Sequence, residues 1–331
     1  MKRAGIIFYI LIIIIAVVIR IDYLMGPVDQ NDNSVHMLKI EKGYNSLEIG
    51  EKLYRNNLIL SKKMFHIFVK LTNLDEKLQA GYYKLSPSYS MREIIEIIVN
   101  GRVATYKITI PEGYDIDRII SKLVKNTGYS EDDFKKVIKD NTFAREYFPP
   151  GDGGYKFKLE GFLYPDTYII PRGFSPRKII KTMLEQFEKK WLTELKTETK
   201  NIEYNILDII TIASLIESEA KIDREKNIIS AVIYNRLQKG MYLQIDAGIQ
   251  YSLDDHKDKL LYSDLKIDSP YNTYLYRGLP PGPICNPGGQ AIRAALNPAN
   301  VDFLFYFALP DGSHVFTESY NEHLRLQSED N

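Results

Sequence analysis

Two carboxylates at the end of an apolar run are the first residues in this sequence that could do chemistry. Residues 206–222 read ILDIITIASLIESEAKI, so Glu217 and Glu219 follow an almost wholly apolar segment. Desolvation of an ionised group against a core is costly, and burial raises the pKa of a carboxyl. A carboxyl that stays protonated near neutral pH can act as a general acid. The alternative is a structural acid paired with a basic residue such as Arg236 on the next predicted helix.

The spacing of the two acids separates them if residues 206–220 form a helix. Residues two apart do not share a helix face, so Glu217 and Glu219 cannot point the same way. We therefore expect one of them to reach a cleft and the other to meet solvent or a buried basic side chain.

The composition argues against metal, cysteine and nucleic-acid chemistry. The 331 residues include 43 Lys and Arg against 43 Asp and Glu, a balance that does not favour nucleic-acid capture. The histidines are scattered without metal-ligand spacing, and the single cysteine, Cys285, has no CxxC partner. We predict no metal, no organic cofactor and no nucleic-acid partner. Hydrophobic content of 44% is enough for a sizeable core.

The N-terminal segment predicts an uncleaved membrane anchor. Lys2 and Arg3 precede the uncharged AGIIFYILIIIIAVVI, which approaches the length of a full span once Arg20 snorkels. No small-x-small cleavage pattern follows. The positive charge before the span favours a single-pass protein of the cell membrane with a cytoplasmic N-terminus, the rest of the chain lying outside. The predicted segments are a cytoplasmic stub at 1–3, a transmembrane anchor at 4–25 and a linker at 26–36.

An internal repeat follows the linker. IEKGYNSLEIGEKLYRNN, residues 40–57, aligns without a gap with IPEGYDIDRIISKLVKNT, residues 110–127. Each copy predicts a strand, a tight turn at the glycine and a helix capped by Asn45 or Asp115. AGYYKLS and SMREIIEIIVNG, between the copies, predict a strand and a helix. The layout over 37–104 resembles a LysM glycan-binding module, with a second LysM-like turn near 110–127; the alternative is a structural duplication without a ligand.

The rest of the chain, residues 105–331, predicts a second α+β domain. Helices are expected over 175–199, over 206–220 and over DREKNIISAVIYNRLQKG, the last capped by Asp223. Loops and strands follow. Within them YLQIDAGIQY predicts a strand, and the Asp311-Gly312 pair predicts a hairpin. The fold class is thus α+β: one membrane helix, a LysM-like α+β module and an α+β domain carrying the acids.

Five ordered blocks carry a resemblance to a known family. They are LEGFLYPDTY, ASLIESEA, VIYNRLQKGMYLQIDAGIQY, SPYNTYLYRGLPPGPICNPG and AALNPAN. Together they resemble the endolytic murein transglycosylase family, also described as YceG-like, and the resemblance covers essentially the whole chain. It implies cleavage of the β-1,4 bond between N-acetylmuramic acid and N-acetylglucosamine in nascent peptidoglycan strands, leaving a 1,6-anhydro end.

The resemblance also implies residue roles, with Glu217 as the catalytic residue and Glu219 as a supporting acid. One carboxyl can serve twice, donating a proton to the glycosidic oxygen and then taking the proton of the muramic acid 6-hydroxyl as that oxygen attacks C1. Gln244 and Asp246, two apart on the predicted strand, would face sugar hydroxyls together. The full set of supporting or substrate-binding candidates is Glu219, Asn235, Arg236, Gln244, Asp246, Tyr271, Asn272, Tyr274 and Glu160.

Two alternatives stay open at this point. A hydrolase of the same glycan would use Glu217 as acid and Asp246 as base, with the carboxyls roughly 6.5 to 9.5 Å apart. A non-catalytic, membrane-tethered glycan-binding scaffold would depend on residues 37–104 and not on Glu217. The predicted partners are the cell membrane and nascent glycan strands, and the family adds the synthases that make those strands.

Overall fold

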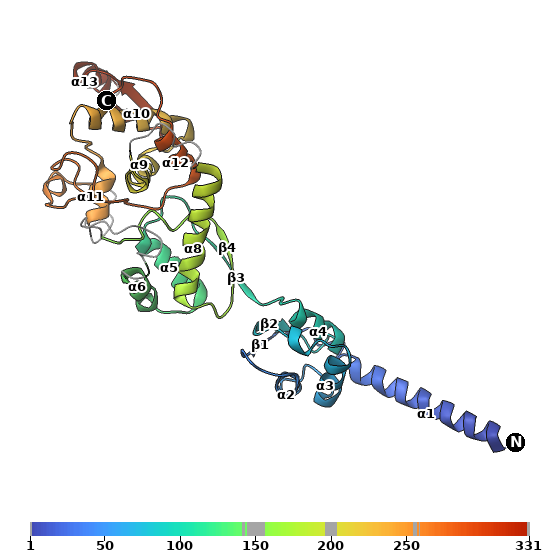
Figure 1. Ribbon diagram of the computed structural model, residues 1–331. Helices are drawn as coiled ribbons and strands as arrows, with labels where there is room; N and C mark the ends of the chain where they lie inside the picture. Colours follow the sequence, from blue (N-terminus) through green and yellow to red (C-terminus); the bar gives the residue numbers. More distant parts are fainter. Residues whose placement is uncertain are drawn as a thin grey trace. The chain divides into compact units, whose positions relative to one another are not determined.

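Helices and short strands form two units in this computed structural model (Figure 1). The structure describes residues 2–140, 143, 156–195, 204–253, 257 and 259–329. Unit 1 comprises Met1–Tyr106 and Ile169–Phe174, and unit 2 comprises Lys107–Tyr168 and Ser175–Asn331. The predicted α+β class is confirmed.

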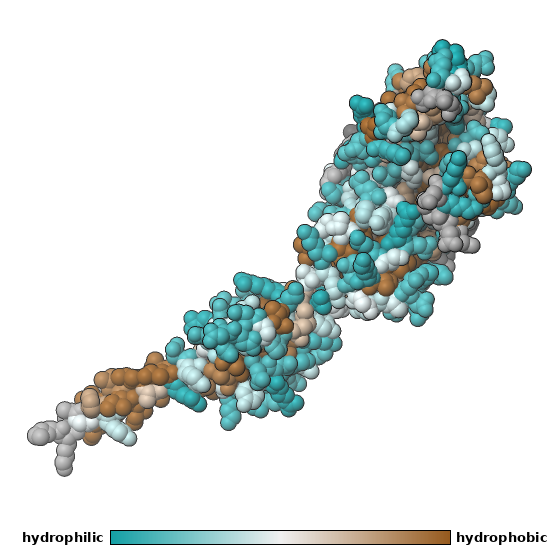
Figure 2. All heavy atoms as spheres, turned by 180° about the vertical axis from the view of Figure 1, so that it is seen from behind, coloured by the Kyte–Doolittle hydropathy of each residue, from teal (hydrophilic) through white to brown (hydrophobic). Residues whose placement is uncertain are grey.

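The N-terminal helix α1 spans Lys2–Met25 and exposes its apolar side chains. Over Gly5–Met25 it is long and apolar enough to cross a membrane, and its most apolar stretch is not buried against protein, although Met25 at the C-terminal end packs against the core of unit 1. Figure 2 shows these side chains as a brown, apolar surface. A helix that is apolar on every side suits a lipid environment. An apolar helix at the predicted anchor is therefore present, while its membrane crossing and orientation stay predictions.

Unit 1 is built around two antiparallel strands, in which Leu38 of β1 lies opposite Tyr83 of β2. The bounds of its elements after α1 are β1 (His36–Ile40), α2 (Ser46–Arg55), α3 (Lys62–Leu71), η1 (Asp75–Lys77), β2 (Gly81–Leu85) and α4 (Met91–Val99). Apolar side chains from all these strands and α-helices fill one core, with Tyr83 and Phe65 fully buried. The two strands and the helices α2 and α4 lie where they were predicted, whereas α3 was not predicted; the assignment as a LysM-like module stays a prediction.

The two copies of the repeat fold alike. Gly43 and Gly113 both take left-handed backbone angles, with φ of 91° and 74°. The Asn45 side chain accepts N–H groups of the first turn of α2, and that of Asp115 accepts the N–H of Arg118 in the first turn of the next helix. Only glycine adopts such angles without strain, which explains why both turns carry it.

Unit 2 holds the larger set of helices. Its elements are α5 (Ile116–Thr127), α6 (Glu131–Lys139), α8 (Pro176–Lys190), the π-helical turn η2 (Trp191–Leu195), α9 (Ile206–Glu219), η4 (Asp223–Glu225), α10 (Lys226–Gln238), α11 (Asp246–Ser252), η5 (Asp264–Lys266), α12 (Gly289–Leu296), β5 (Phe305–Ala308), β6 (His314–Thr317) and α13 (Tyr320–Glu329). Strand β3 (Thr105–Thr109) pairs with β4 (Thr167–Pro171), and the boundary between the units falls within both strands.

Helix α9 is the core of unit 2. Residues 209–216 are all buried, and the helix packs against α10, α11 and α12, of which Figure 1 shows α10 and α12 beside it. A helix with apolar residues on every face needs such cover on every side. The apolar run therefore serves to place the C-terminal end of α9, with its two acids, among the neighbouring helices.

Most predicted helices and the hairpin are found, with shifted ends. The helix predicted over 206–220 is α9, capped by Asn205. The helix predicted over 175–199 begins at Pro176 and continues through η2 to Leu195; residues 196–199 lie outside the described part. Strands β5 and β6 form the predicted antiparallel hairpin, with Gly312 at φ 84° in its turn.

Two local predictions were wrong. Asp223 does not cap α10, because it begins the short turn η4 and its carboxylate pairs with Lys226 at 3.0 Å. YLQIDAGIQY is not a strand: Gln244 has a left-handed φ of 52°, and α11 begins at Asp246. Apolar and polar residues do alternate here, with Leu243 and Ile245 buried, but they belong to a loop that leads into the short helix α11.

Gly161 provides a test of the packing beneath the acids. Its φ is 86°, and a Cβ there would lie 2.6 Å from Pro283 and 2.7 Å from Ile210. We expect Gly161→Ala to lower the free energy of unfolding by about 2–5 kcal/mol, from backbone strain and overpacking together. Gly128→Ala is the matched control, because its φ is 80° but nothing lies within 4 Å. Denaturant unfolding of both variants checks this, and equal losses would contradict the packing part.

Candidate functional site

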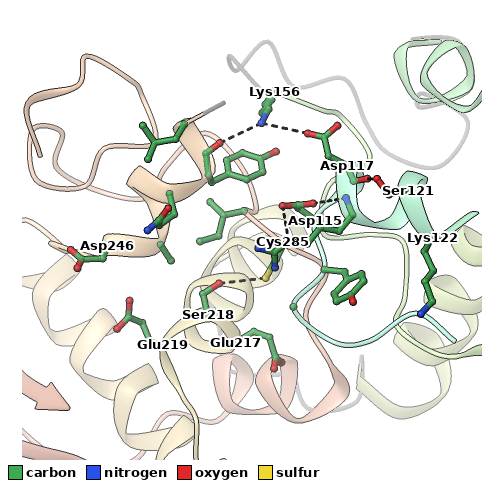
Figure 3. A pocket seen from close by; sticks show the side chains of 18 of the residues that line it. Asp115, Asp117, Ser121, Lys122, Lys156, Glu217, Ser218, Glu219, Asp246 and Cys285 are labelled. Atoms are coloured by element: carbon green, nitrogen blue, oxygen red, sulfur yellow. Dashed lines mark hydrogen bonds and ion pairs between the residues drawn. The ribbon is translucent and has the colours of Figure 1, made fainter. Parts of the chain in front are cut away.

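A cleft of about 1230 Å³ opens in unit 2 beside the C-terminal end of α9 (Figure 3). Its walls come from α5, α9, α11 and the loop at residues 284–285. This volume exceeds the roughly 300–1,000 Å³ of typical small-molecule pockets, so it suits a segment of a polymer. Its charged lining residues are the acids Asp115, Asp117, Glu217, Glu219 and Asp246 and the bases Arg118, Lys122, Lys125, Lys156 and Lys221.

Glu217 is held between an ammonium group and the start of a helix. Its Oε1 lies 3.4 Å from Nζ of Lys226, and its Oε2 accepts the N–H of Gly288, the N-cap of α12, at 3.1 Å. The Glu217 and Lys226 side chains are 10% and 5% exposed. An ammonium ion and a helix N-terminus both stabilise a carboxylate. The partner of Glu217 is therefore Lys226 and not Arg236, and apolar surroundings are only part of its environment.

Glu219 faces a different environment. It accepts a hydrogen bond from the Tyr306 hydroxyl at 3.2 Å, and desolvation together with the charge of Asp246 raises the pKa of Glu219 to about 7. Figure 3 shows the Glu217 and Glu219 carboxyl groups pointing in different directions. The predicted divergence of the two acids is confirmed, although both line the cleft.

A smaller side pocket of about 340 Å³ shares Glu219 and Asp246 with the cleft. Tyr274 and Gln244 line it, and the Tyr274 hydroxyl donates to Oδ1 of Asp246 at 2.6 Å. The β5–β6 hairpin and α13 add aromatic rings to its wall, namely Phe305, Tyr306, Phe307 and Tyr320. Aromatic faces beside carboxylates and amides are typical of carbohydrate sites. From the sequence we predicted this hairpin without a role in the site, and its many aromatic residues were the available indication of one.

Asn235 and Arg236 bind main-chain oxygens. The amide of Asn235 donates to Val301 at 2.8 Å and to Phe303 at 3.0 Å. Arg236 donates to Leu304 and to Leu243, each at 2.6 Å. These bonds tie α10 to the segments on either side of it. Arg236 also lines the side pocket, but its main-chain contacts indicate a structural role and not a direct contact with substrate.

Asn272 corrects the expectation of a sugar contact. It is fully buried, its amide donates to the carbonyls of Leu265 and Ile267 at 3.0 and 2.8 Å, and its Oδ1 accepts the N–H of Tyr274 at 3.0 Å. Its role is to shape the loop that presents Tyr274. The neighbouring Tyr271 is also buried.

Glu160 lies outside both pockets and is buried. Its carboxyl accepts the N–H of Ile116 at 3.2 Å, the hydroxyl of Tyr251 at 3.0 Å and the amide of Asn286 at 2.8 Å. Burial raises the pKa of Glu160 to about 8. These contacts join the start of α5 to the loop before α12, so Glu160 supports the cleft wall from below.

Three residues around the Glu217 carboxyl were not among the sequence candidates: Lys226, Gly288 and Glu112. Glu112 lies in the glycine turn of the second repeat copy, and desolvation and the charge of Glu217 raise its pKa. A Cβ on Gly288 would overlap the Glu112 carboxyl. Gly288 and Glu112 could not be found from local sequence, because they reach the site from segments distant from Glu217. Lys226 is near Glu217 in sequence, but its contact with Glu217 depends on the turn η4 between α9 and α10. Within the described residues no group of three or more His, Cys, Asp or Glu could hold a metal ion.

Comparison with known proteins gives consistent relatives. A sequence model of the YceG-like family matches residues 38–329. The chain is 35% identical over 311 residues to a Bacillus subtilis (strain 168) protein named endolytic murein transglycosylase, covering 91% of this chain and 86% of that protein. It is 30% identical to a Streptococcus pneumoniae (strain D39) protein of the same name, over 92% of this chain but only 60% of that protein.

A solved structure is similar as well. The crystal structure of a yceG-like protein from Listeria monocytogenes matches with a TM-score of 0.63 and 33% identity, covering 88% of this chain and 99% of that one. The similarity therefore includes both units of the chain, since the family match also begins within β1.

Glu219 makes the stability of the protein depend on pH. Its pKa of about 7 in the folded state exceeds the value of about 4.3 in unfolded chains, so folding retains a proton between these pH values. We expect this residue to lower the free energy of unfolding by roughly 3 kcal/mol as pH rises through that window. Glu219→Gln should remove this part of the slope, measured by urea unfolding at several pH values.

Asp246→Asn is the control for the pH effect. This variant leaves Glu219 buried but removes the charge of Asp246 beside it. The pH range over which Glu219 lowers the free energy of unfolding should therefore become narrower but not disappear. Glu160, with its pKa of about 8, contributes a further slope to every variant alike. An unchanged slope in Glu219→Gln would contradict the prediction.

Proposed function

The chain belongs to the YceG-like family, and we propose that it is an endolytic murein transglycosylase that cuts peptidoglycan glycan strands. The observation that carries this proposal is the 35% identity, over 91% of the chain, with a relative of that name. The site supports it independently, because α9 delivers a carboxyl to a polymer-sized cleft.

In the proposed reaction Glu217 is the catalytic residue and acts twice. As an acid it gives its proton to the glycosidic oxygen while the bond from that oxygen to C1 of N-acetylmuramic acid breaks. As a base it then takes the proton of the 6-hydroxyl while that oxygen bonds to C1. No water is consumed, and the new end is a 1,6-anhydro sugar. Such proton transfers by a positioned carboxyl contribute about 10²–10⁴-fold to rate.

The surroundings of Glu217 support the step between the two transfers. Once its proton has left, the carboxylate faces the ammonium of Lys226 and the N–H of Gly288. Both groups are preorganised by packing, so they stabilise the charge without having to reorganise. The cleft and the side pocket meet at Glu219 and Asp246, which offers a strand room to continue past the cleft. Gln244, Asp246 and Tyr274 are the proposed contacts there.

In this proposal the apolar helix α1 determines on which side of the cell membrane the activity lies. With Lys2 and Arg3 before the apolar segment, α1 would anchor the chain with its N-terminus in the cytoplasm. Unit 2 would then work outside the membrane, where nascent strands are made. Unit 1 would act as the LysM-like glycan-binding module, and the strand synthases would be partners.

Product analysis tests the proposal. We expect the full-length protein in detergent to convert uncrosslinked glycan strands into fragments with 1,6-anhydro ends, identified by mass spectrometry. Glu217→Gln should lower the rate at least about 100-fold, because it removes the proton-transfer group. Its thermal unfolding temperature should fall, because glutamine leaves the buried Lys226 ammonium with Asp223 as its charged partner, so the rates are compared at a temperature at which both proteins are folded.

Two outcomes would overturn this reading. Free reducing ends that disappear in Asp246→Asn would indicate a hydrolase that uses Glu217 and Asp246. Strand binding without any cleavage by the wild type would indicate a scaffold, and removal of residues 37–104 should then abolish binding.

A further inference from the structure

Glu112 is a carboxyl at the site that the proposed reaction does not use. It lies between β3 and α5, next to Gly113, and a Cβ on Gly113 would lie 3.8 Å from Cγ of Glu217. The turn itself therefore packs on the catalytic side chain. In the first copy of the repeat the matching position is Lys42, so the turn can form without a carboxyl there.

Gly288 brings Glu112 and Glu217 together. Its N–H donates to Oε2 of Glu217 at 3.1 Å, while the Glu112 carboxyl occupies the space that a Cβ of Gly288 would fill. The backbone angles of Gly288, φ −75° and ψ 168°, are open to any residue. A glycine suits this position because of the space that Glu112 occupies and not because of backbone conformation.

The charges around this pair are unbalanced. Lys226 faces Glu217 from α10, and its ammonium also pairs with Asp223 of η4 at 3.0 Å. Glu112 adds a third carboxyl from the β3–α5 turn. Cys285 lies beyond, buried, with its thiol near Ser218. One cation beside three carboxyls favours the retention of a proton by one of the carboxyls. Desolvation and the charge of Glu217 raise the pKa of Glu112, and the charge of Lys226 opposes this rise.

We propose that Glu112 stores the proton that Glu217 passes to and from the substrate. The two carboxyls hold one proton between them, on Glu112 in the free enzyme and on Glu217 when the glycosidic oxygen is in place. This inference rests on the proposed function. Glu112 acts through Glu217 and does not touch the substrate, so it is a positioning residue for the proton.

The proton count closes over one cycle. Glu112 gives its proton to the Glu217 carboxylate, and Glu217 gives it to the glycosidic oxygen as the bond to C1 breaks. Glu217 then takes the 6-hydroxyl proton as O6 bonds to C1, and returns it to Glu112. Lys226 offsets the single negative charge of the resting pair, and between the two transfers, when both carboxyls are ionised, it offsets one of the pair's two negative charges. Coupled carboxyls of this kind titrate as a pair.

The pH profile of cleavage by the full-length protein tests this role. Wild-type kcat should fall as pH rises and the pair loses its proton. Glu112→Gln should lower kcat at neutral pH by about tenfold and move this fall to lower pH, because no second carboxyl then retains the proton beside Glu217. KM should not change. Glu112→Asp, which keeps a carboxyl, should restore most of the rate and the profile.

Two further variants separate charge from contact. Gly288→Ala keeps the N–H to Glu217 but displaces the Glu112 carboxyl, so it should reproduce the profile of Glu112→Gln. The double variant should lose no more than either single one. Asp223→Asn is the comparison, because it removes a charge from the same ammonium without touching Gly288; its profile should move in the direction of Glu112→Gln but by less, since the charge of Asp223 is the smallest of the influences on Glu112.

A wild-type rate and profile in Glu112→Gln would overturn the inference, and so would a lower rate with an unmoved profile, which indicates a structural role. Absence of anhydro ends from the wild type would count against the proposed function instead. Carbon-13 NMR titration of the carboxyl groups in the full-length chain then tests the coupling of Glu112 and Glu217 without relying on activity. The Glu112 signal should titrate above its ordinary range and return toward it in Glu217→Gln; an ordinary wild-type titration would overturn the pair.

Discussion

The contact between the Glu217 carboxylate, the Lys226 ammonium and the N-terminus of α12 is the constraint on which the rest of unit 2 depends. A carboxylate and an ammonium this little exposed are costly to desolvate, and they are tolerable only when each stays close to the other. The pair needs α9, α10 and α12 to converge at one point. The buried residues of α9 make them converge, because they pack against all three neighbouring helices. The apolar residues of α9, which by themselves disfavour a charged carboxylate, are the residues that bring the partners of Glu217 into place.

The same helix end supplies two carboxyls with different properties. Glu217 lies beside a cation and a helix N-terminus, whereas Glu219 lies beside a tyrosine hydroxyl and Asp246, and its pKa is raised. Groups of one chemical type are commonly divided between roles by environments of this kind. Glu219 joins the cleft to the side pocket, so its charge state affects both. The burial of Glu219 lowers the free energy of unfolding near neutral pH, and in return the site has two carboxyls with different acidities.

The internal repeat shows one local structure used in two ways. In unit 1 the turn at Gly43 closes a small strand-helix element whose side chains fill the core of that unit. In unit 2 the turn at Gly113 packs on Glu217, and the residue before its glycine is an acid where the first copy has Lys42. The backbone is conserved between the copies because glycine and the helix cap determine it locally. The chemistry of the second copy comes from a single side-chain difference.

The sequence by itself determined what depends on neighbours along the chain. The apolar anchor helix, the glycine turns with their caps, helix α9, the hairpin at Gly312 and the divergence of Glu217 and Glu219 all follow from local propensity and periodicity. Only the tertiary structure decided which groups meet. It paired Glu217 with Lys226 and not with Arg236, the partner considered in the alternative interpretation, buried Asn272 in its own loop, replaced a strand by α11 and brought Glu112 to the site. Glu112 and Gly288 reach Glu217 from segments far apart in sequence. The partners of Lys226 and Asn272 are near in sequence, but which of them meet depends on how whole helices and loops pack, which no local pattern encodes.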